Sequence, residues 1–180
     1  AAMRELQQAT QDAQEAWARL ELPSIALIEG ACVGGGCGLA LACDLRLATP
    51  DAYFAITPAK LGLVYSLADT RRLCDLVGPA RAKEMLFTAA RVDADAALAM
   101  GLVNRIVPAA QLEATGRALA EQIAAQAPNS VRAAKRIVNA ILGGQREETD
   151  TTRAWFNEAF ESPQFQEGAA AFLAKRSPRF

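Results

Sequence analysis

The sequence predicts an α/β fold built in layers, and three features of its first third indicate this. Residues 25–28 form a short, continuous apolar run, which is typical of a strand buried on both faces. Four glycines within 34–38 follow, and 39–43 has the Ala- and Leu-rich composition of a buried helix. Two more strand candidates, 44–48 and 53–56, come next. Strand, turn, helix, strand order favours an α/β layer architecture.

Helices are predicted on both sides of this segment. Residues 3–20 repeat apolar side chains at helical spacing, and this helix is expected to end before Pro23. Beyond Ser66 the pattern is almost wholly helical, apart from one strand-like link at 102–107. We expect helices there at 67–77, 80–88, 93–100, 111–127 and 130–142. An aromatic-rich helical tail follows from 155 onward.

Local stop and start residues divide this helical part. Gly78-Pro79 is a stop and start pair, and Asn129 or Ser130 is a plausible N-cap for the helix that follows Pro128. We therefore expect two parts, an α/β core at 1–105 and a helical region at 106–180.

Composition excludes several classes of partner. The chain has 19 basic and 20 acidic side chains among 180 residues, so its charge gives no argument for nucleic acid. No apolar stretch approaches the roughly 20 residues of a membrane-spanning helix. The first 20 residues lack a signal-peptide pattern, and the four cysteines lack Cys-x-x-Cys spacing. We expect reduced cysteines and a cytoplasmic protein.

The absence of histidine limits the chemistry. It removes the Ser-His-Asp and Cys-His nucleophile systems and the common zinc-ligand sets, so we expect no metal site. Proton transfer would have to use carboxylate, Tyr, Lys or Cys side chains, or water.

The glycines leave main-chain N–H groups bare at a helix start, where a phosphate or a developing oxyanion can bind. The dinucleotide pattern Gly-x-Gly-x-x-Gly fails in both registers, because Leu39 and Leu41 stand where its last glycine is required. A P-loop fails because no Gly-Lys-Ser/Thr follows. Two interpretations remain: a tight turn that lets a helix pack on a strand, or an oxyanion hole, where one donor is worth about 3 to 4 kcal/mol.

A resemblance to a known family bears on this choice. Residues 25–48, IALIEGACVGGGCGLALACDLRLA, resemble the core signature of the crotonase superfamily, the enoyl-CoA hydratase/isomerase family. The similarity extends over roughly 23–180. Later segments that resemble the family's later signatures are Phe54, 61–63, 72–73, 77–78, 80–84 and 101–104.

The resemblance implies a crotonase (ClpP/crotonase-like) fold of repeated ββα units, with a helical C-terminal region that forms a homotrimer or a dimer of trimers. It also implies acyl-CoA thioester substrates and enolate-type intermediates, with coenzyme A as part of the substrate and no separate cofactor. Family members begin with several strands before the position of Ala1, so the N-terminal part of the fold is expected to be missing from this chain.

By the same resemblance, Gly35 is the backbone donor of one half of the oxyanion hole, flanked by Gly34 and Gly36 as binding positions. The second donor would come from the N-terminal region that precedes this chain in the family. Lys175, with its basic neighbours at the C-terminal end, could meet the CoA phosphates, or could belong to a solvated basic tail.

The acid and base positions depart from those of a hydratase. Gly38 and Pro58 stand where hydratases carry their two glutamates. A positioned general acid or base is worth roughly 10²- to 10⁴-fold in rate, so classical hydration is not expected.

Residues 54–67 and 160–176 instead resemble the methylmalonyl-CoA decarboxylase branch, although that branch keeps a glutamate at the position of Gly38. Loss of CO₂ forms the enolate directly and needs no base. The Tyr65 and Thr57 hydroxyl groups could orient the substrate carboxylate. Tyr65 could equally be a pocket wall or core residue, and Thr57 a turn residue. The leading prediction is decarboxylation of a malonyl-type CoA.

Two alternatives stay open. Asp69, near the start of a predicted helix, could be the acid/base of an enoyl-CoA isomerase or an atypical hydratase, or it could simply suit the helix dipole. The chain could also belong to a catalytically silent protein that binds acyl-CoA, since both glutamates are replaced.

Overall fold

The computed structural model describes residues 2–180, and the side chains from Glu5 onward. The chain forms two compact units. The first takes in the residues up to Leu20 together with Ser24–Arg117, and the second takes in Glu21–Pro23 and Ala118–Phe180. The domain boundary expected after residue 105 stays a prediction, because compactness alone does not define a domain.

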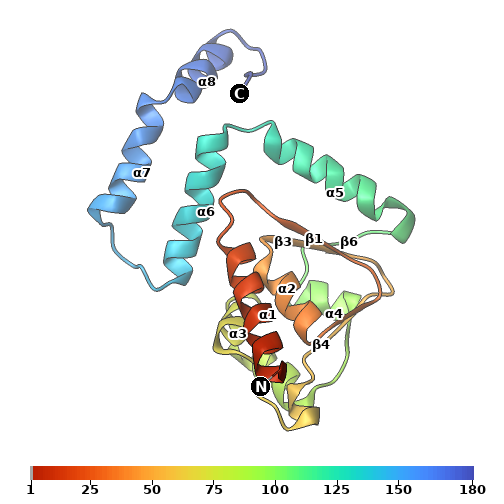
Figure 1. Cartoon of the computed structure of the whole chain (residues 1–180). Helices are drawn as coiled ribbons and strands as arrows, with labels where there is room; N and C mark the ends of the chain where they lie inside the picture. Colours follow the sequence, from red (N-terminus) through yellow and green to blue (C-terminus); the bar gives the residue numbers. More distant parts are fainter. Residues whose placement is uncertain (1) are drawn as a thin grey trace. The chain divides into compact units, whose positions relative to one another are not determined.

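The first unit alternates between two small sheets (Figure 1). One sheet has the order β1-β3-β6 and is parallel, and the other has the order β2-β4-β5, in which β2 and β4 are parallel and β4 and β5 antiparallel. Twice, two consecutive strands, one in each sheet, are followed by a helix, which is the predicted ββα repeat. The elements are α1 (Ala2–Ala18), β1 (Ile25–Ile28), β2 (Ala31–Val33), α2 (Gly35–Ala42), β3 (Leu45–Ala48), β4 (Tyr53–Ala55), a 3₁₀ turn (Pro58–Leu61), α3 (Leu67–Thr88), β5 (Val92–Asp93), α4 (Ala94–Ala99), β6 (Arg105–Ile106) and the start of α5 (Ala109–Ala124).

The strand before the glycines and the start of the helix after them differ from the prediction. β2 occupies Ala31–Val33, which the sequence analysis had not assigned to a strand, and α2 begins at Gly35 rather than at Leu39. The short strand was missed because three residues carry too little alternation to recognise. The glycines therefore form the first turn of α2 itself.

A buried arginine ties β3 to its surroundings. Arg46 is 3% exposed, and its guanidinium donates hydrogen bonds to the carbonyl oxygens of Leu102, Ala40 and Cys43. Burial lowers the pKa of Arg46 from its ordinary value, while nearby Cys43 and Asp44 oppose that shift. The guanidinium thus satisfies the carbonyl oxygens at the end of α2, a structural role.

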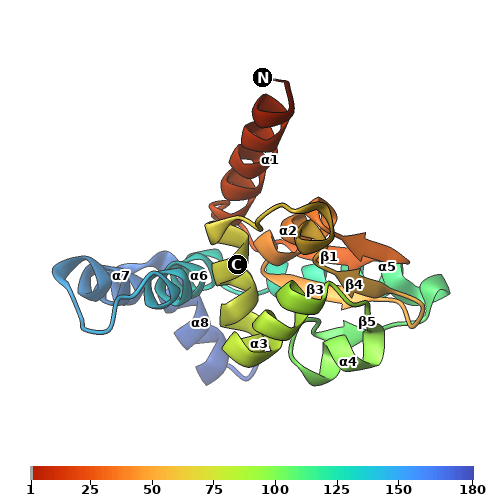
Figure 2. The ribbon, with the colours of Figure 1, turned by 90° about the horizontal axis from the view of Figure 1, so that it is seen from below.

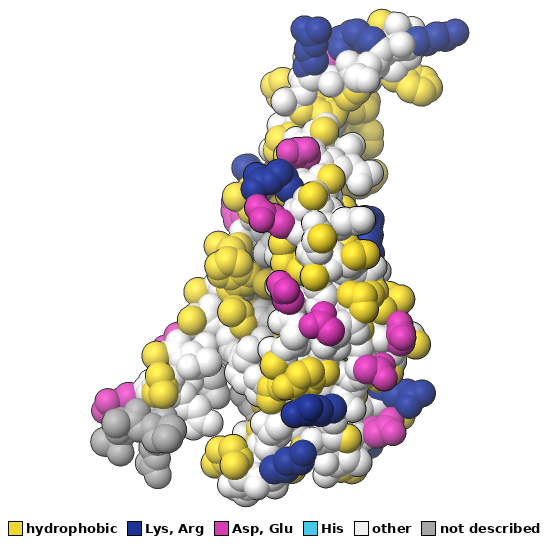
Figure 3. All heavy atoms as spheres, turned by 90° about the vertical axis from the view of Figure 1, so that its right-hand side faces the viewer, with side chains coloured by type: hydrophobic (Ala, Val, Ile, Leu, Met, Phe, Trp, Pro, Cys, Tyr) yellow, Lys and Arg dark blue, Asp and Glu magenta, His cyan; other side chains and the backbone are white. Residues whose placement is uncertain are grey.

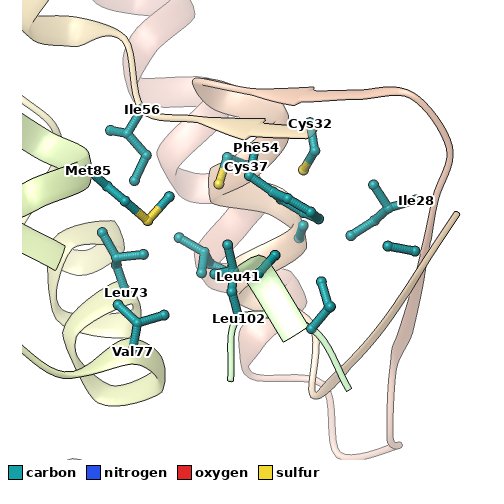
Figure 4. Packing of buried hydrophobic residues seen from close by; sticks show 14 of the residues in the cluster. Ile28, Cys32, Cys37, Leu41, Phe54, Ile56, Leu73, Val77, Met85 and Leu102 are labelled. Atoms are coloured by element: carbon teal, nitrogen blue, oxygen red, sulfur yellow. The ribbon is translucent and has the colours of Figure 1, made fainter. Parts of the chain in front are cut away.

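The core of this unit lies between the sheets, α2 and α3. Figure 4 shows side chains from these elements pointing toward one another, with Phe54 of β4 in their midst. Phe54 is 1% exposed, and Leu73 of α3 is fully buried. All four cysteines are free. The pKa of the buried Cys37 thiol is raised well above its ordinary value by its hydrogen bond with Cys32 and by burial, so Cys37 stays a neutral thiol.

Helix α3 contains the predicted break. Its interior includes Gly78 with φ 76° and ψ 162°, followed by Pro79, so two helical stretches meet there without a gap. A positive φ suits glycine, and the proline can begin the second stretch because it needs no N–H partner. This confirms the stop and start pair predicted from the sequence.

The second unit is helical. It contains the end of α5 together with α6 (Pro128–Leu142), α7 (Asp150–Glu161) and α8 (Pro163–Leu173). The predicted N-cap of α6 is wrong: the cap position is Ala127, with Pro128 as the first helical residue. Proline is favoured at that position because its fixed φ is already helical.

One face of the molecule carries charges of both signs. On the face shown in Figure 3, acidic, basic and hydrophobic side chains are interspersed over the lower half, and several basic ones gather at the upper end. Among the residues that the structure describes, no helix is long and apolar enough to cross a membrane.

Candidate active site

The glycine segment presents two backbone N–H groups at the start of α2. Gly34 caps this helix with φ 55° and ψ −115°, and its own N–H donates to the Ala55 carbonyl of β4 at 2.9 Å. Gly35 and Gly36 are exposed, and a Cβ built on either would meet nothing within 4 Å. Within residues 2–180, no acceptor pairs with either N–H. Free N–H groups at the positive end of a helix can stabilise an anion or an oxyanion.

Tyr65 holds the peptide group that carries the Gly35 N–H. Its hydroxyl donates to the Gly34 carbonyl oxygen at 3.3 Å, and the Gly38 N–H reaches the same oxygen at 3.0 Å. Burial, assisted by nearby Cys37 and Asp69, raises the pKa of Tyr65, so the hydroxyl keeps its proton. Because that one proton is engaged with the backbone, Tyr65 is placed to support the glycines.

Thr57 lies against the same glycine. Its Oγ1 is 3.6 Å from the position of a Cβ on Gly34. The residue also closes the turn before the 3₁₀ segment, since its carbonyl oxygen accepts the Lys60 N–H at 3.0 Å. Thr57 is therefore both a turn residue and a neighbour of the candidate site.

Asp69 is buried at the start of α3, at 5% exposure. Its Oδ2 accepts a hydrogen bond from Ser66 Oγ at 2.8 Å, and its Oδ1 pairs with Arg72 Nη1 at 3.3 Å. The same Oδ2 lies 3.2 Å from the position of a Cβ on Gly38. The Asp69 carboxylate of α3 thus lies beside the backbone of Gly38 in α2.

A residue that the sequence analysis missed completes this cluster. Gln14 of α1 is 4% exposed and donates from Nε2 to the Gly35 carbonyl oxygen at 3.2 Å. Its neighbour Glu15 forms an ion pair with Arg72, which also pairs with Asp69. The available signal was spacing: Gln14 lies three residues before Trp17, one of the apolar residues that the sequence places on a common face of this helix.

Lys175 belongs to the second unit. It is exposed and follows the end of α8 with φ 50°, a left-handed conformation. The nearby Arg176 is engaged with Glu167 at 2.6 Å. A CoA-binding role for Lys175 stays a prediction.

Within the described part of the chain, no three His, Cys, Asp or Glu side chains gather as metal ligands do. The groups that gather at the start of α2 are instead backbone N–H groups, one carboxylate, two hydroxyls and one amide. They can stabilise a negative oxygen and move a proton.

Known proteins resemble this chain in sequence and fold. The family described as enoyl-CoA hydratase/isomerase matches residues 1–180. The short-chain-enoyl-CoA hydratase of Clostridium acetobutylicum is 37% identical over 161 residues, which are 87% of this chain and 60% of that protein. The mitochondrial Delta(3,5)-Delta(2,4)-dienoyl-CoA isomerase of Dictyostelium discoideum is 38% identical over 160 residues, 88% of this chain and 55% of that protein. The chain thus spans less than two thirds of either relative.

A solved structure agrees closely. An enoyl-CoA hydratase/isomerase family protein from Hyphomonas neptunium superposes with a TM-score of 0.95 at 43% identity, covering 99% of this chain and 68% of the other. The match along the whole chain and the shared ββα architecture lead to one assignment: the chain belongs to the enoyl-CoA hydratase/isomerase family and has its crotonase fold.

Proposed function

We propose that the protein acts on acyl-CoA thioesters, stabilises an enolate at the start of α2, and moves a proton through Asp69. The supporting observation is the pairing of free N–H groups at Gly35 and Gly36 with a buried carboxylate beside Gly38. Enolate formation places negative charge on the thioester oxygen, and backbone N–H groups can bind that charge without reorganising.

The reaction best suited to one carboxylate is double-bond migration in an enoyl-CoA. The Asp69 carboxylate takes a proton from C2 of a 3-enoyl thioester, and the C–H electron pair moves toward the thioester oxygen. The protonated Asp69 then returns the proton to C4, which takes it with the electron pair of the 3,4 double bond. The C1=C2 pair of the enolate becomes the 2,3 double bond, and the thioester carbonyl re-forms. The reaction consumes no water and requires no second carboxylate, which suits a site with glycine at 38 and proline at 58.

Decarboxylation of a malonyl-type CoA is the second candidate. It is favoured by the position of Thr57 against Gly34, where a hydroxyl could meet a substrate carboxylate. The Tyr65 hydroxyl, the other predicted orienting group, already donates to the backbone. The two curated relatives named above are a hydratase and an isomerase, and this favours the proton-transfer reaction over decarboxylation.

Asp69→Asn in the full-length protein separates the candidates. Assays with a 3-enoyl-CoA and with methylmalonyl-CoA would show which substrate turns over. If Asp69 moves the proton, the variant loses about 10²- to 10⁴-fold in kcat on the enoyl-CoA. Asp75→Asn is a matched control, because Asp75 is exposed on the same helix.

Unchanged isomerisation by a folded Asp69→Asn protein contradicts the acid/base role, with thermal unfolding as the check on folding. Release of propionyl-CoA from methylmalonyl-CoA at a rate that Asp69→Asn leaves intact supports decarboxylation instead. Binding of CoA thioesters with no turnover of either substrate supports the silent binder.

A further inference from the structure

Gln14 is the point at which α1 reaches the candidate site. Among the α1 side chains from Glu5 to Ala18, it alone is buried. Figure 2 shows the N-terminal part of α1 projecting away from the other elements of its unit, while its C-terminal part lies near α2. A buried, uncharged amide on an otherwise exposed helix needs a partner, and that partner is the Gly35 carbonyl oxygen at 3.2 Å.

The two peptide groups that present free N–H groups are held in the same way. Tyr65 donates to the Gly34 carbonyl, whose peptide carries the Gly35 N–H. Gln14 donates to the Gly35 carbonyl, whose peptide carries the Gly36 N–H. In a trans peptide the C=O and N–H point in opposite directions, so holding the oxygen fixes the direction of the hydrogen. A hydrogen bond at the oxygen also strengthens the N–H as a donor.

The Gln14 amide occupies the space that a side chain at position 38 would enter. A Cβ built on Gly38 would overlap Gln14 Nε2 and would also lie 3.2 Å from Asp69 Oδ2. The amide therefore fills the space beside the bare backbone, and the absence of a side chain at 38 is what admits it.

We propose that Gln14 is a positioning residue for the Gly35–Gly36 site, which it holds by way of the Gly35 carbonyl, in the space that glycine at 38 leaves open. This inference rests on the proposed oxyanion role of the glycines. It assigns to α1 a part in the chemistry, besides its packing against α2.

The first test does not depend on activity. NMR of the full-length protein would follow the Gly35 and Gly36 amides in Gln14→Leu, which keeps the bulk of the side chain and removes the donor. A shift of the Gly36 amide resonance is expected, because the carbonyl oxygen of its peptide loses the Gln14 donor. Gln8→Leu is the matched control, since Gln8 is exposed on the same helix and donates to Asp12. Equal spectra at Gly36 in both variants overturn the proposal.

The second test uses turnover of the substrate that the wild-type protein accepts. Removing a donor from an oxyanion site costs about 10²- to 10³-fold in kcat, so misaligning one is expected to cost roughly tenfold, with KM nearly unchanged. A rise in KM alone would indicate a packing role and overturn positioning. If the wild type turns over no thioester, the proposed function fails, while the amide spectra still decide the role of Gln14.

A double-mutant cycle tests the match with position 38. Gly38→Ala is expected to lower stability more in the wild-type background than in Gln14→Ala, because in the wild type the added Cβ displaces the amide from the Gly35 carbonyl. Additive effects of the two changes would contradict the coupling of Gln14 to Gly38.

Discussion

The two units of this chain differ in what they bury. In the first unit, the strands and helices α2 and α3 enclose side chains such as Phe54 and Leu73, both at 1% exposure or less. In the second unit, Ala171 is the one buried hydrophobic side chain among the described residues, while Phe172 is 82% exposed. The first unit thus has a core of its own, whereas the helices of the second leave large apolar side chains uncovered.

The aromatic side chains of the second unit show what this difference means. Phe156, Phe160 and Phe165 pack edge to face, with ring centroids 5.2 and 5.5 Å apart, yet each remains at least half exposed. Such contacts order the rings but remove little apolar surface from water. The homotrimer or dimer of trimers expected from the sequence resemblance would need such a surface, and it stays a prediction.

The largest expected effect tests the core of the first unit. Phe54→Ala should lower the free energy of unfolding by about 3–5 kcal/mol, because the buried ring leaves a cavity that its neighbours cannot fill. Denaturant unfolding of the full-length protein measures this. Phe87→Ala, at 75% exposure in the same unit, is the matched control, and an equal loss from both would contradict the assignment of the core.

A smaller effect is expected where the core meets the site. Gly34→Ala should cost about 1–3 kcal/mol, because φ 55° with ψ −115° strains any residue that carries a Cβ. The added Cβ would only touch Thr57 Oγ1 at an ordinary 3.6 Å, so strain and not overlap is the cause. Gly36→Ala has open space and no positive φ, and the same denaturant measurement should show a clearly smaller loss.

Phe172→Ala in the second unit should change the unfolding free energy of a dilute, dissociated chain by less than about 0.5 kcal/mol, because the ring is already exposed. Sedimentation at higher concentration tests whether other copies cover it. We expect the mass of three or six chains for the full-length protein, and a lower mass for the variant. An unchanged mass would remove Phe172 from the interface, and a monomeric wild type would contradict the predicted oligomer.

The smallest effect concerns the C-terminal end. The hydrogen bond from Arg176 lowers the pKa of Glu167 to about 2, and the Arg179 backbone N–H adds to this. A carboxylate whose pKa is lowered on folding stabilises the folded form at pH values above its ordinary pKa of 4.5. This contribution is lost as the pH falls toward 2. Acid should therefore loosen the segment after α8, as measured by amide exchange there, and Glu167→Gln should remove the pH dependence. Equal pH dependence in both proteins would show that other groups cause it.

Local pattern was enough to predict much of this protein. The apolar run at β1, the break at Gly78-Pro79 and a helix after the first glycines were visible because each depends on neighbouring residues, although α2 begins at Gly35 and not at Leu39. The family resemblance, which the comparisons confirm, lay in the same continuous stretch of chain. The short strands β2 and β5 were missed, since two or three residues carry no periodicity and exist only through their pairing with β4.

The sequence by itself thus determined the α/β class and the family, and it predicted the glycines as the place for an oxyanion. Only the tertiary structure decided what surrounds them: the Tyr65 hydroxyl on the Gly34 carbonyl, the Asp69 carboxylate beside Gly38, and Gln14. Gln14 and Gly38 are far apart in sequence, and no local rule links a polar residue of one helix to a missing side chain on another. The packing of α1 on α2 brings Gln14 and Gly38 together. The buried Gln14 amide needs a hydrogen-bond partner, and Gly38 leaves space for it.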